Sequence, residues 1–309
     1  MLDKKIRILD LDGSVAKQNN LLARYDNEVI GLKDLGPLAR HWCSRKTRSL
    51  IEGRISGSAR NTITFIGSGD YHHISEILID QFKEPISLIC FDYHPDWTAL
   101  PPRYGCGSWV TEVLKKKNVR KAVLFGASSE DLSSFNIQSG SLGAFKDDRL
   151  EIFPFAHEPS RVFLRKIWRN SSIKSRKGVF SDRIFWTQIK EGDMAGLFEA
   201  ALKRVPTKEV YVSIDKDCLK NDYALTNWEE GVFSLEQLLS LLALIKKNKR
   251  IIGLDITGDY SIVSVKGLAR KITVYLDHPR LIKAGQMPQA QVNSINEGTN
   301  IKLVDFINS

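Results

Sequence analysis

The chain has 309 residues, of which 42% are hydrophobic and 26% are charged. This composition supports a large hydrophobic core, and the apolar runs fall short of the ~20 residues that span a bilayer. Four scattered cysteines without a C-x-x-C pair argue against a zinc cage or a disulfide framework. The first residues lack the apolar stretch and cleavage site of a secretory signal, so a cytoplasmic protein is expected.

The net charge is +9, and basic residues crowd into residues 45–48, 115–117 and 161–183. Along the sequence these runs form no recognisable pattern of basic and aromatic residues, so we interpret them as a solvated basic face. We expect a small-molecule substrate, for which this charge would suit an anion, and neither a nucleic-acid partner nor a membrane. Assembly into a homo-oligomer is left open.

Apolar, β-branched runs alternate with amphipathic patterns along the chain. Several runs show no two-residue alternation, as expected for strands that are buried on both faces of a parallel sheet. Repeated strand–helix–strand units predict a three-layer α/β/α sandwich with a mostly parallel central sheet, formed by a single domain over residues 1–309. The expected strands are residues 6–9, 62–66, 86–91, 122–125, 151–155, 210–214, 251–256 and 272–276.

Two amphipathic stretches, residues 74–82 and 235–242, are expected to form helices. The second follows a capping box made by Ser234 and Gln237. Residues 157–192 are less regular and are expected to form an insertion over one edge of the sheet. Residues 286–300 are polar and are expected to wrap the surface.

Acidic and histidine side chains follow three of the expected strands, the first of which runs into Asp70, His72 and His73. In open α/β sheets, ligands bind outside the carboxyl ends of the strands. Asp92, His94 and Asp96 are spaced by two after one strand, so in extended backbone they point the same way. Asp215 and Asp217 repeat this spacing after another strand. Converging buried carboxylates repel one another unless cations lie among them, and oxygen and imidazole ligands suit Mn²⁺.

The order of three motifs resembles the arginase/agmatinase (ureohydrolase) family. These motifs are Gly69-Asp70-Tyr71-His72, Asp92-Tyr-His94-Pro-Asp96 and Ser213-Ile-Asp215-Lys-Asp217, followed by Gly253-Leu-Asp-Ile-Thr257. The resemblance implies an arginase/deacetylase-like fold and two Mn²⁺ ions per chain. Asp92, Asp96 and Asp215 with one histidine would bind the first ion, and His94 and Asp217 the second, with Asp92 and Asp215 as bridges. It further implies hydrolysis of a C–N bond in an amidine, guanidine or amide by a hydroxide held between the ions.

The histidine of the first motif departs from the family pattern. In the family it directly follows Gly-Asp, whereas here Tyr71 intervenes and His72 and His73 form a pair. We favour His72 as the metal ligand because it needs the smaller shift, and we expect His73 to shape the pocket.

The substrate-binding positions depart further. The glutamate by which the family grips a guanidinium corresponds to Gly258, with Asp259 beside it. The family's proton-transferring loop histidine is missing, which leaves Cys106 and Ser108 as candidates. We therefore expect a substrate other than arginine and take His73, Cys106 and Asp259 as catalytic candidates.

Residues 227–231 precede the capped helix and offer a further pocket wall. Trp228 could line it, and Glu229 or Glu230 could receive a cationic substrate; a plain surface loop is the alternative.

Two other functions remain open. Asp10 and Asp12 end the first strand in a D-x-D-G motif that resembles the haloacid-dehalogenase-type phosphatases. A non-catalytic, metal-stabilised arginase-like binding domain is the other alternative.

Overall fold

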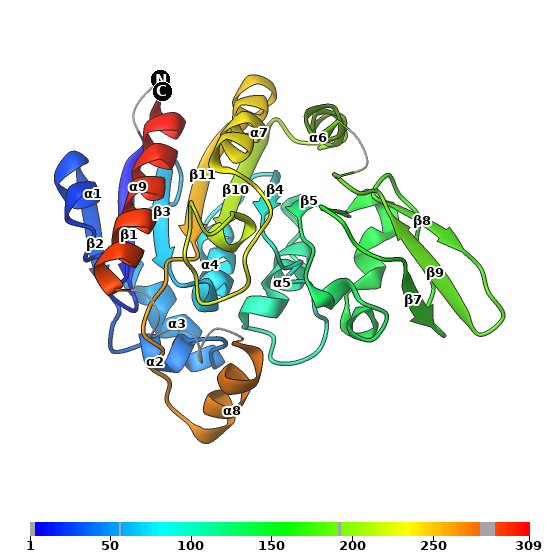
Figure 1. Ribbon diagram of the computed structural model, residues 1–309, viewed down its shortest axis with the longest axis horizontal. Helices are drawn as coiled ribbons and strands as arrows, with labels where there is room; N and C mark the ends of the chain where they lie inside the picture. The colour runs from blue at the N-terminus through cyan, green and yellow to red at the C-terminus, as the bar shows by residue number, and fades with distance from the viewer. Residues whose placement is uncertain (1–3, 56, 191–192, 279–287) are drawn as a thin grey trace.

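The computed structural model describes residues 4–55, 57–190, 193–278 and 288–309. Its centre is an eight-stranded sheet in the order β2-β1-β3-β11-β10-β4-β5-β6, and every neighbouring pair is parallel (Figure 1). The strands are β1 (Lys5–Asp10), β2 (Asn27–Gly31), β3 (Thr62–Gly67), β4 (Ile86–Phe91), β5 (Val119–Gly126), β6 (Leu150–Pro154), β10 (Glu209–Asp215) and β11 (Arg250–Thr257).

Helices cover both faces of this sheet and give the expected three layers (Figure 1). They are α1 (Asn19–Arg24), α2 (Gly36–Ala39), α3 (Arg45–Arg54), α4 (Ser75–Asp80), α5 (Trp109–Leu114), α6 (Met194–Lys203), α7 (Leu235–Asn248), α8 (Leu268–Asp277) and α9 (Gln289–Asn308). The α/β/α class predicted from the sequence is confirmed.

Two hydrophobic clusters lie on the two faces of the sheet. Because side chains alternate along a strand, Leu88 of β4 joins one cluster and Ile89 the other. The first cluster includes buried residues of α3, α4 and α5, and the second includes buried residues of α6, α7 and α9. The strands are therefore apolar on both sides, which explains why no alternation was visible in the sequence.

Helix α7 begins as predicted. The Ser234 side chain accepts a hydrogen bond from the Gln237 backbone N–H, and the Gln237 side chain accepts one from the Ser234 backbone N–H. This reciprocal pair satisfies two of the donors that every helix start leaves without an intrahelical partner.

Two expectations near the C-terminus are wrong. Residues 272–276 belong to helix α8: Arg270 and Val274, four residues apart, share its buried side, whereas Ile272 and Tyr275 are exposed, a helical period that a strand would not give. The polar segment 286–300 is not a surface tail: its residues from 289 onward belong to α9, and those at 286 and 287 lie outside the described residues. One side of that helix, which includes Val292 and Leu303, is buried.

Residues 157–190 of the irregular segment expected at 157–192 form an insertion beside the sheet edge formed by β6, and residues 191 and 192 lie outside the described residues. It contains β7 (Ser160–Phe163), β8 (Ile173–Arg176) and β9 (Ser181–Trp186), which form a separate antiparallel sheet in the order β7-β9-β8. Figure 1 shows this sheet projecting from one end of the molecule.

Within the described ranges, no helix combines the length and the apolar character needed to cross a membrane.

Candidate metal centre

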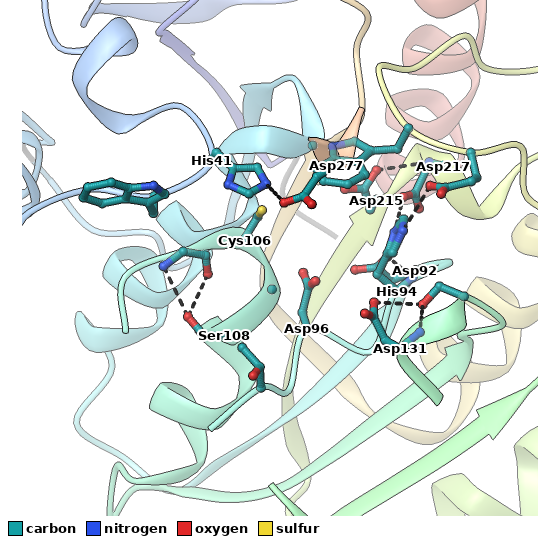
Figure 2. A pocket seen from close by; sticks show the side chains of 18 of the residues that line it. His41, Asp92, His94, Asp96, Cys106, Ser108, Asp131, Asp215, Asp217 and Asp277 are labelled. Atoms are coloured by element: carbon teal, nitrogen blue, oxygen red, sulfur yellow. Dashed lines mark hydrogen bonds and ion pairs between the residues drawn. The ribbon is translucent and has the colours of Figure 1, made fainter. Parts of the chain in front are cut away.

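The six predicted metal ligands meet outside the carboxyl ends of three strands. His72 lies in the 3-10 helix η1 (Gly69–Ile74) after β3, the motif from Asp92 to Asp96 follows β4, and Asp215 and Asp217 lie at the end of β10. Five of these residues line one pocket of about 400 Å³, and His72 lies behind it in contact with their carboxylates (Figure 2). The sheet order places β4 beside β10 and separates β10 from β3 by β11 alone, which brings these sequence-distant motifs together.

His72 directs one ring nitrogen at three carboxylates. Its Nδ1 lies 3.1 Å from Asp92 Oδ2, 3.1 Å from Asp96 Oδ2 and 3.5 Å from Asp215 Oδ2. None of these contacts meets hydrogen-bond geometry, and among the described residues His72 Nδ1 and Asp92 Oδ2 have no hydrogen-bond partner. Orphaned buried polar atoms of this kind call for a missing ion.

The other nitrogen of His72 is held from behind. Ser213 Oγ donates to Asp255 Oδ1 at 2.6 Å, so it must accept the hydrogen bond from His72 Nε2 at 2.8 Å. These hydrogen bonds place a proton on Nε2, so Nδ1, which faces the carboxylates, is the nitrogen that could bind a metal ion. An outer-shell carboxylate that orients a histidine in this way is typical of metal sites.

His94 makes the equivalent contact on the other side of Asp92. Its Nδ1 lies 2.8 Å from Asp217 Oδ2 and 3.8 Å from Asp92 Oδ1. The ligand atoms of Asp92, His94 and Asp217 all lie within 4.8 Å of one another. Glu229 Oε2 lies 3.2 Å from His94 Nε2, an ion-pair contact on the other side of the ring.

The cluster cannot hold all its negative charges without a cation. Burial and the repulsion from Asp96 and Asp217 raise the pKa of Asp92 well above its usual value. Burial and the neighbouring Asp217 raise the pKa of Asp215 to about 8. Metal-free, the cluster takes up protons; divalent ions would displace them and restore the carboxylates. The donor set therefore fits the expected metal pair.

Trp109 supports the site but was missed in the sequence. Its indole Nε1 donates to Asp96 Oδ2 at 2.6 Å, and its ring lies 4.7 Å from that of His72. Asp96 itself has a φ of 46°, a left-handed backbone that non-glycine residues seldom adopt outside functional sites. No local pattern links Trp109 to Asp96, because the contact forms only when the intervening loop folds back.

His73 lies outside the metal pocket, contrary to its predicted pocket-shaping role. In a 3-10 helix successive side chains point about 120° apart, so only one member of the His72–His73 pair can face the cluster. His73 instead lines a small recess on another side of the helix, together with Glu76 and Tyr104. Burial, followed by the influence of His41, lowers its pKa to about 3, so its imidazole is neutral.

Gly258 packs directly against a proposed metal ligand. Its φ is 90°, and a Cβ atom at this position would lie 2.5 Å from Asp215 Oδ1. A glutamate could not be accommodated here without moving Asp215. Glycine is therefore the residue that fits at this position beside Asp215.

Asp259 does not line the metal pocket, so its predicted contact with substrate is wrong. It is fully buried and lies 2.9 Å from Lys216 Nζ, with further hydrogen bonds from Gln18 and Asn300. One step along the chain from Gly258 turns the side chain toward the opposite face. Asp259 is therefore the counter-ion of a buried lysine.

We expect Asp259→Ala to destabilise the protein by about 3–5 kcal/mol, because it leaves the Lys216 charge buried and unpaired. Urea denaturation would measure this loss. Asp222→Ala, at an exposed aspartate, is the control and should leave the free energy of unfolding almost unchanged. If the Asp259→Ala variant kept its full free energy of unfolding but showed a large fall in kcat, Asp259 would have a role in catalysis instead.

Cys106 lies in the pocket wall, as predicted, but as a neutral thiol. Burial and the charge of Asp96 raise its pKa well above the usual value, so no thiolate is available near neutral pH. Ser108 donates to the carbonyl oxygens of Pro102 and Arg103 and thereby shapes the loop. A catalytic role for Cys106 stays a prediction.

A histidine–aspartate pair on the pocket wall was not anticipated. His41 Nε2 lies 3.1 Å from Asp277 Oδ2, and both residues line the pocket opposite the ligand carboxylates (Figure 2). Trp228 stacks on His41 with ring centres 5.9 Å apart and also contacts His94. Trp228 and Glu229 line the pocket, as the sequence suggested, whereas Glu230 binds Asn221.

Asp10 and Asp12, the residues of the phosphatase-like motif, make structural contacts outside the metal pocket. Asp12 accepts hydrogen bonds from the Ser68 backbone N–H and from Arg40, and Asp10 pairs with the exposed Lys33. Neither aspartate lines the metal pocket. These contacts account for both residues and remove the basis of the phosphatase interpretation.

Comparison with known proteins agrees with the fold described above. A family model described as the arginase family matches residues 164–258. An uncharacterized protein of Thermotoga maritima is 28% identical over 198 residues, which cover 64% of this chain and 58% of that relative. The chain thus spans less than two thirds of that relative's length.

Two solved structures share the fold. A hypothetical agmatinase from Burkholderia thailandensis superposes with a TM-score of 0.54 at 15% identity, covering 98% of this chain and 85% of the other. A formiminoglutamase variant from Trypanosoma cruzi, solved with Mn²⁺, gives 0.55 at 11% identity, covering 100% and 95%. The fold of this chain is therefore arginase-like, and its residues 164–258 are similar to the arginase family model.

Proposed function

We propose that the pocket is the active site of a C–N bond hydrolase that binds two divalent ions, with manganese as the metal. The observation that carries this proposal is the orphaned pair of His72 Nδ1 and Asp92 Oδ2 within a group of buried carboxylates. The Mn²⁺ in the Trypanosoma cruzi structure supports the choice of metal.

Each residue of the cluster has a place in this scheme. One ion would be held by His72, Asp92, Asp96 and Asp215, and the other by Asp92, His94, Asp215 and Asp217. When bound, such a pair supplies Lewis acidity and lowers the pKa of water from about 16 toward 7. Ser213 keeps the imidazole of His72 in position, and Glu229 contacts that of His94.

The walls of the pocket favour a positively charged substrate. Beyond the ligands, Glu130, Asp131, Glu229 and Asp277 line it, and none of its described lining residues is lysine or arginine. These acidic walls disfavour an anionic substrate, which the net positive charge of the whole chain had suggested. It suits an amidine, guanidine or amide on a cationic molecule, and it disfavours arginine, whose carboxylate would find no basic partner.

His41 is placed to carry a proton in this reaction. Its Nε2 is held by Asp277, which orients the ring toward the pocket. The pair thus offers the acid–base group that the family's missing loop histidine would otherwise supply.

Steady-state kinetics with Mn²⁺ tests the proposal. We expect agmatine or an N-acetylated diamine to be hydrolysed with a kcat/KM about tenfold or more above that of arginine. Glu130→Gln and Asp131→Asn should reduce the ratio of kcat/KM for the cationic substrates to kcat/KM for arginine. A kcat/KM that is highest for arginine would contradict the substrate assignment, and metal-loaded protein that hydrolyses none of these compounds would indicate the non-catalytic binding domain.

A further inference from the structure

The sheet formed by β7, β9 and β8 has one buried and one exposed face. Facing the body of the protein are Ser160, Val162, Ile173, Ile184 and Trp186, all of them buried. Because side chains alternate along strands, the residues between them point outward. This outer face consists of Arg161 and Phe163 on β7, Lys174 and Arg176 on β8, and Ser181, Arg183 and Phe185 on β9.

Three arginines form a row across the outer face. The strand register places Arg161 directly opposite Arg183, and Arg183 directly opposite Arg176. Like charges in directly opposed positions destabilise a sheet. Within the described parts of the chain, no ion pair joins any of the three to an acidic side chain. An external anion would relieve this repulsion.

Aromatic rings flank the arginine row on both sides. Phe163 lies two residues beyond Arg161 on β7, and Phe185 lies two residues beyond Arg183 on β9, in the opposite direction along the sheet. Their exposed fractions are 48% and 36%. The basic and aromatic residues are thus interleaved in space, although the linear sequence does not show this pattern.

The surrounding segment is strongly basic. Residues 157–190 contain nine lysines and arginines but only two acidic residues, a net charge of +7 against +9 for the whole chain. Asp182 accepts a hydrogen bond from the Gly178 backbone N–H and lies on the face opposite the arginine row. The segment that contains the projecting sheet therefore carries a large share of the net positive charge of the protein.

We propose that this outer face binds single-stranded nucleic acid. Guanidinium groups pair with phosphates through planar, forked hydrogen bonds, and exposed aromatic rings stack on unpaired bases. A row of arginines between two rings offers both contacts to one strand without reading its sequence. The proposal revises the solvated face that the linear charge pattern indicated, and it is independent of hydrolysis in the metal pocket.

A membrane surface is the competing occupant. Leu164, Val179 and Phe180 are 100%, 92% and 85% exposed at one end of the same sheet, where apolar side chains could enter a lipid layer. The charges, however, lie in a row across the strands of the outer face. That arrangement matches a linear polyanion better than a planar lipid surface.

Fluorescence anisotropy of the full chain with labelled oligo-dT and oligo-U of about 20 nucleotides tests the proposal. We expect saturable binding that weakens between about 50 and 200 mM salt. The triple variant Arg161→Gln/Arg176→Gln/Arg183→Gln should weaken binding more than about tenfold and reduce the slope of log K against log salt by about 2. Phe185→Ala should weaken binding about fivefold or more through lost stacking.

Two controls make this test specific. Arg45→Gln/Lys117→Gln/Arg120→Gln removes the same charge from exposed positions on other elements and should retain most of the binding. Thermal melting of the outer-face variants should be at least that of the parent protein, because their side chains are exposed and the like-charge row is relieved.

Several outcomes would overturn the proposal. They are absence of oligonucleotide binding at low salt, equal weakening by the control triple, and equal affinity for a duplex. Binding to phosphatidylserine vesicles that requires Leu164, Val179 and Phe180, without oligonucleotide binding, would assign the sheet to a membrane instead.

Discussion

Asp92→Asn will empty both metal subsites and reduce hydrolysis more than about 100-fold, since losing even an outer-shell partner of a metal site costs about 10–100-fold. Asp92 Oδ2 faces His72 Nδ1 at 3.1 Å, and its Oδ1 faces His94 Nδ1 at 3.8 Å, so the carboxylate stands between the two subsites. An amide removes the charge and replaces one oxygen by a donor that cannot bind a cation.

Inductively coupled plasma analysis after dialysis against Mn²⁺ measures this effect. The parent protein should hold about two ions per chain, with the content falling as the pH is lowered, because protons compete for the same carboxylates. Asp10→Asn is the matched control, since it breaks only a pair with an exposed lysine, and it should keep both ions and full activity. Two retained ions in Asp92→Asn would refute the bridging role.

His41→Asn will lower kcat by about 10²–10⁴-fold while leaving the metal content unchanged, as expected for loss of a general acid or base. The His41 backbone has a φ of 70° and is fixed at both ends: its N–H donates to Asp70 and its carbonyl accepts from the Cys106 N–H. This strained, doubly held conformation keeps the imidazole against Asp277 at the pocket wall.

The pH profile separates catalysis from structure. In a plot of kcat against pH, the parent enzyme should show a pH-dependent limb that is absent in His41→Asn. A purely structural change would instead lower kcat by the same factor at every pH. His157→Asn, at a histidine outside the metal pocket, is the control and should leave kcat unchanged. A His41→Asn enzyme with unchanged kcat would leave Cys106 or solvent as the proton carrier.

Local pattern was sufficient for the parts of the site that depend on backbone periodicity. The strand expected at residues 86–91 is β4, and the spacing of two places the ligands that follow it on one side. The strand and the order of the ligands along the chain depend on local pattern, so the sequence alone determined them. Gly258 and Asp259 lie beyond the end of β11, where the first packs on Asp215 and the second pairs with Lys216, and no local pattern predicted these contacts.

Contacts between distant segments were decided only by the tertiary structure. His41 meets Asp277, and Trp109 meets Asp96, because the folded loops bring them together; no spacing in the sequence records either pair. The choice between His72 and His73 depended on a 3-10 helix that the motif did not reveal. The row of Arg161, Arg183 and Arg176 exists only through the antiparallel register of three strands. Periodicity fixes the direction of a side chain relative to its own backbone, whereas its partners depend on how separate elements pack.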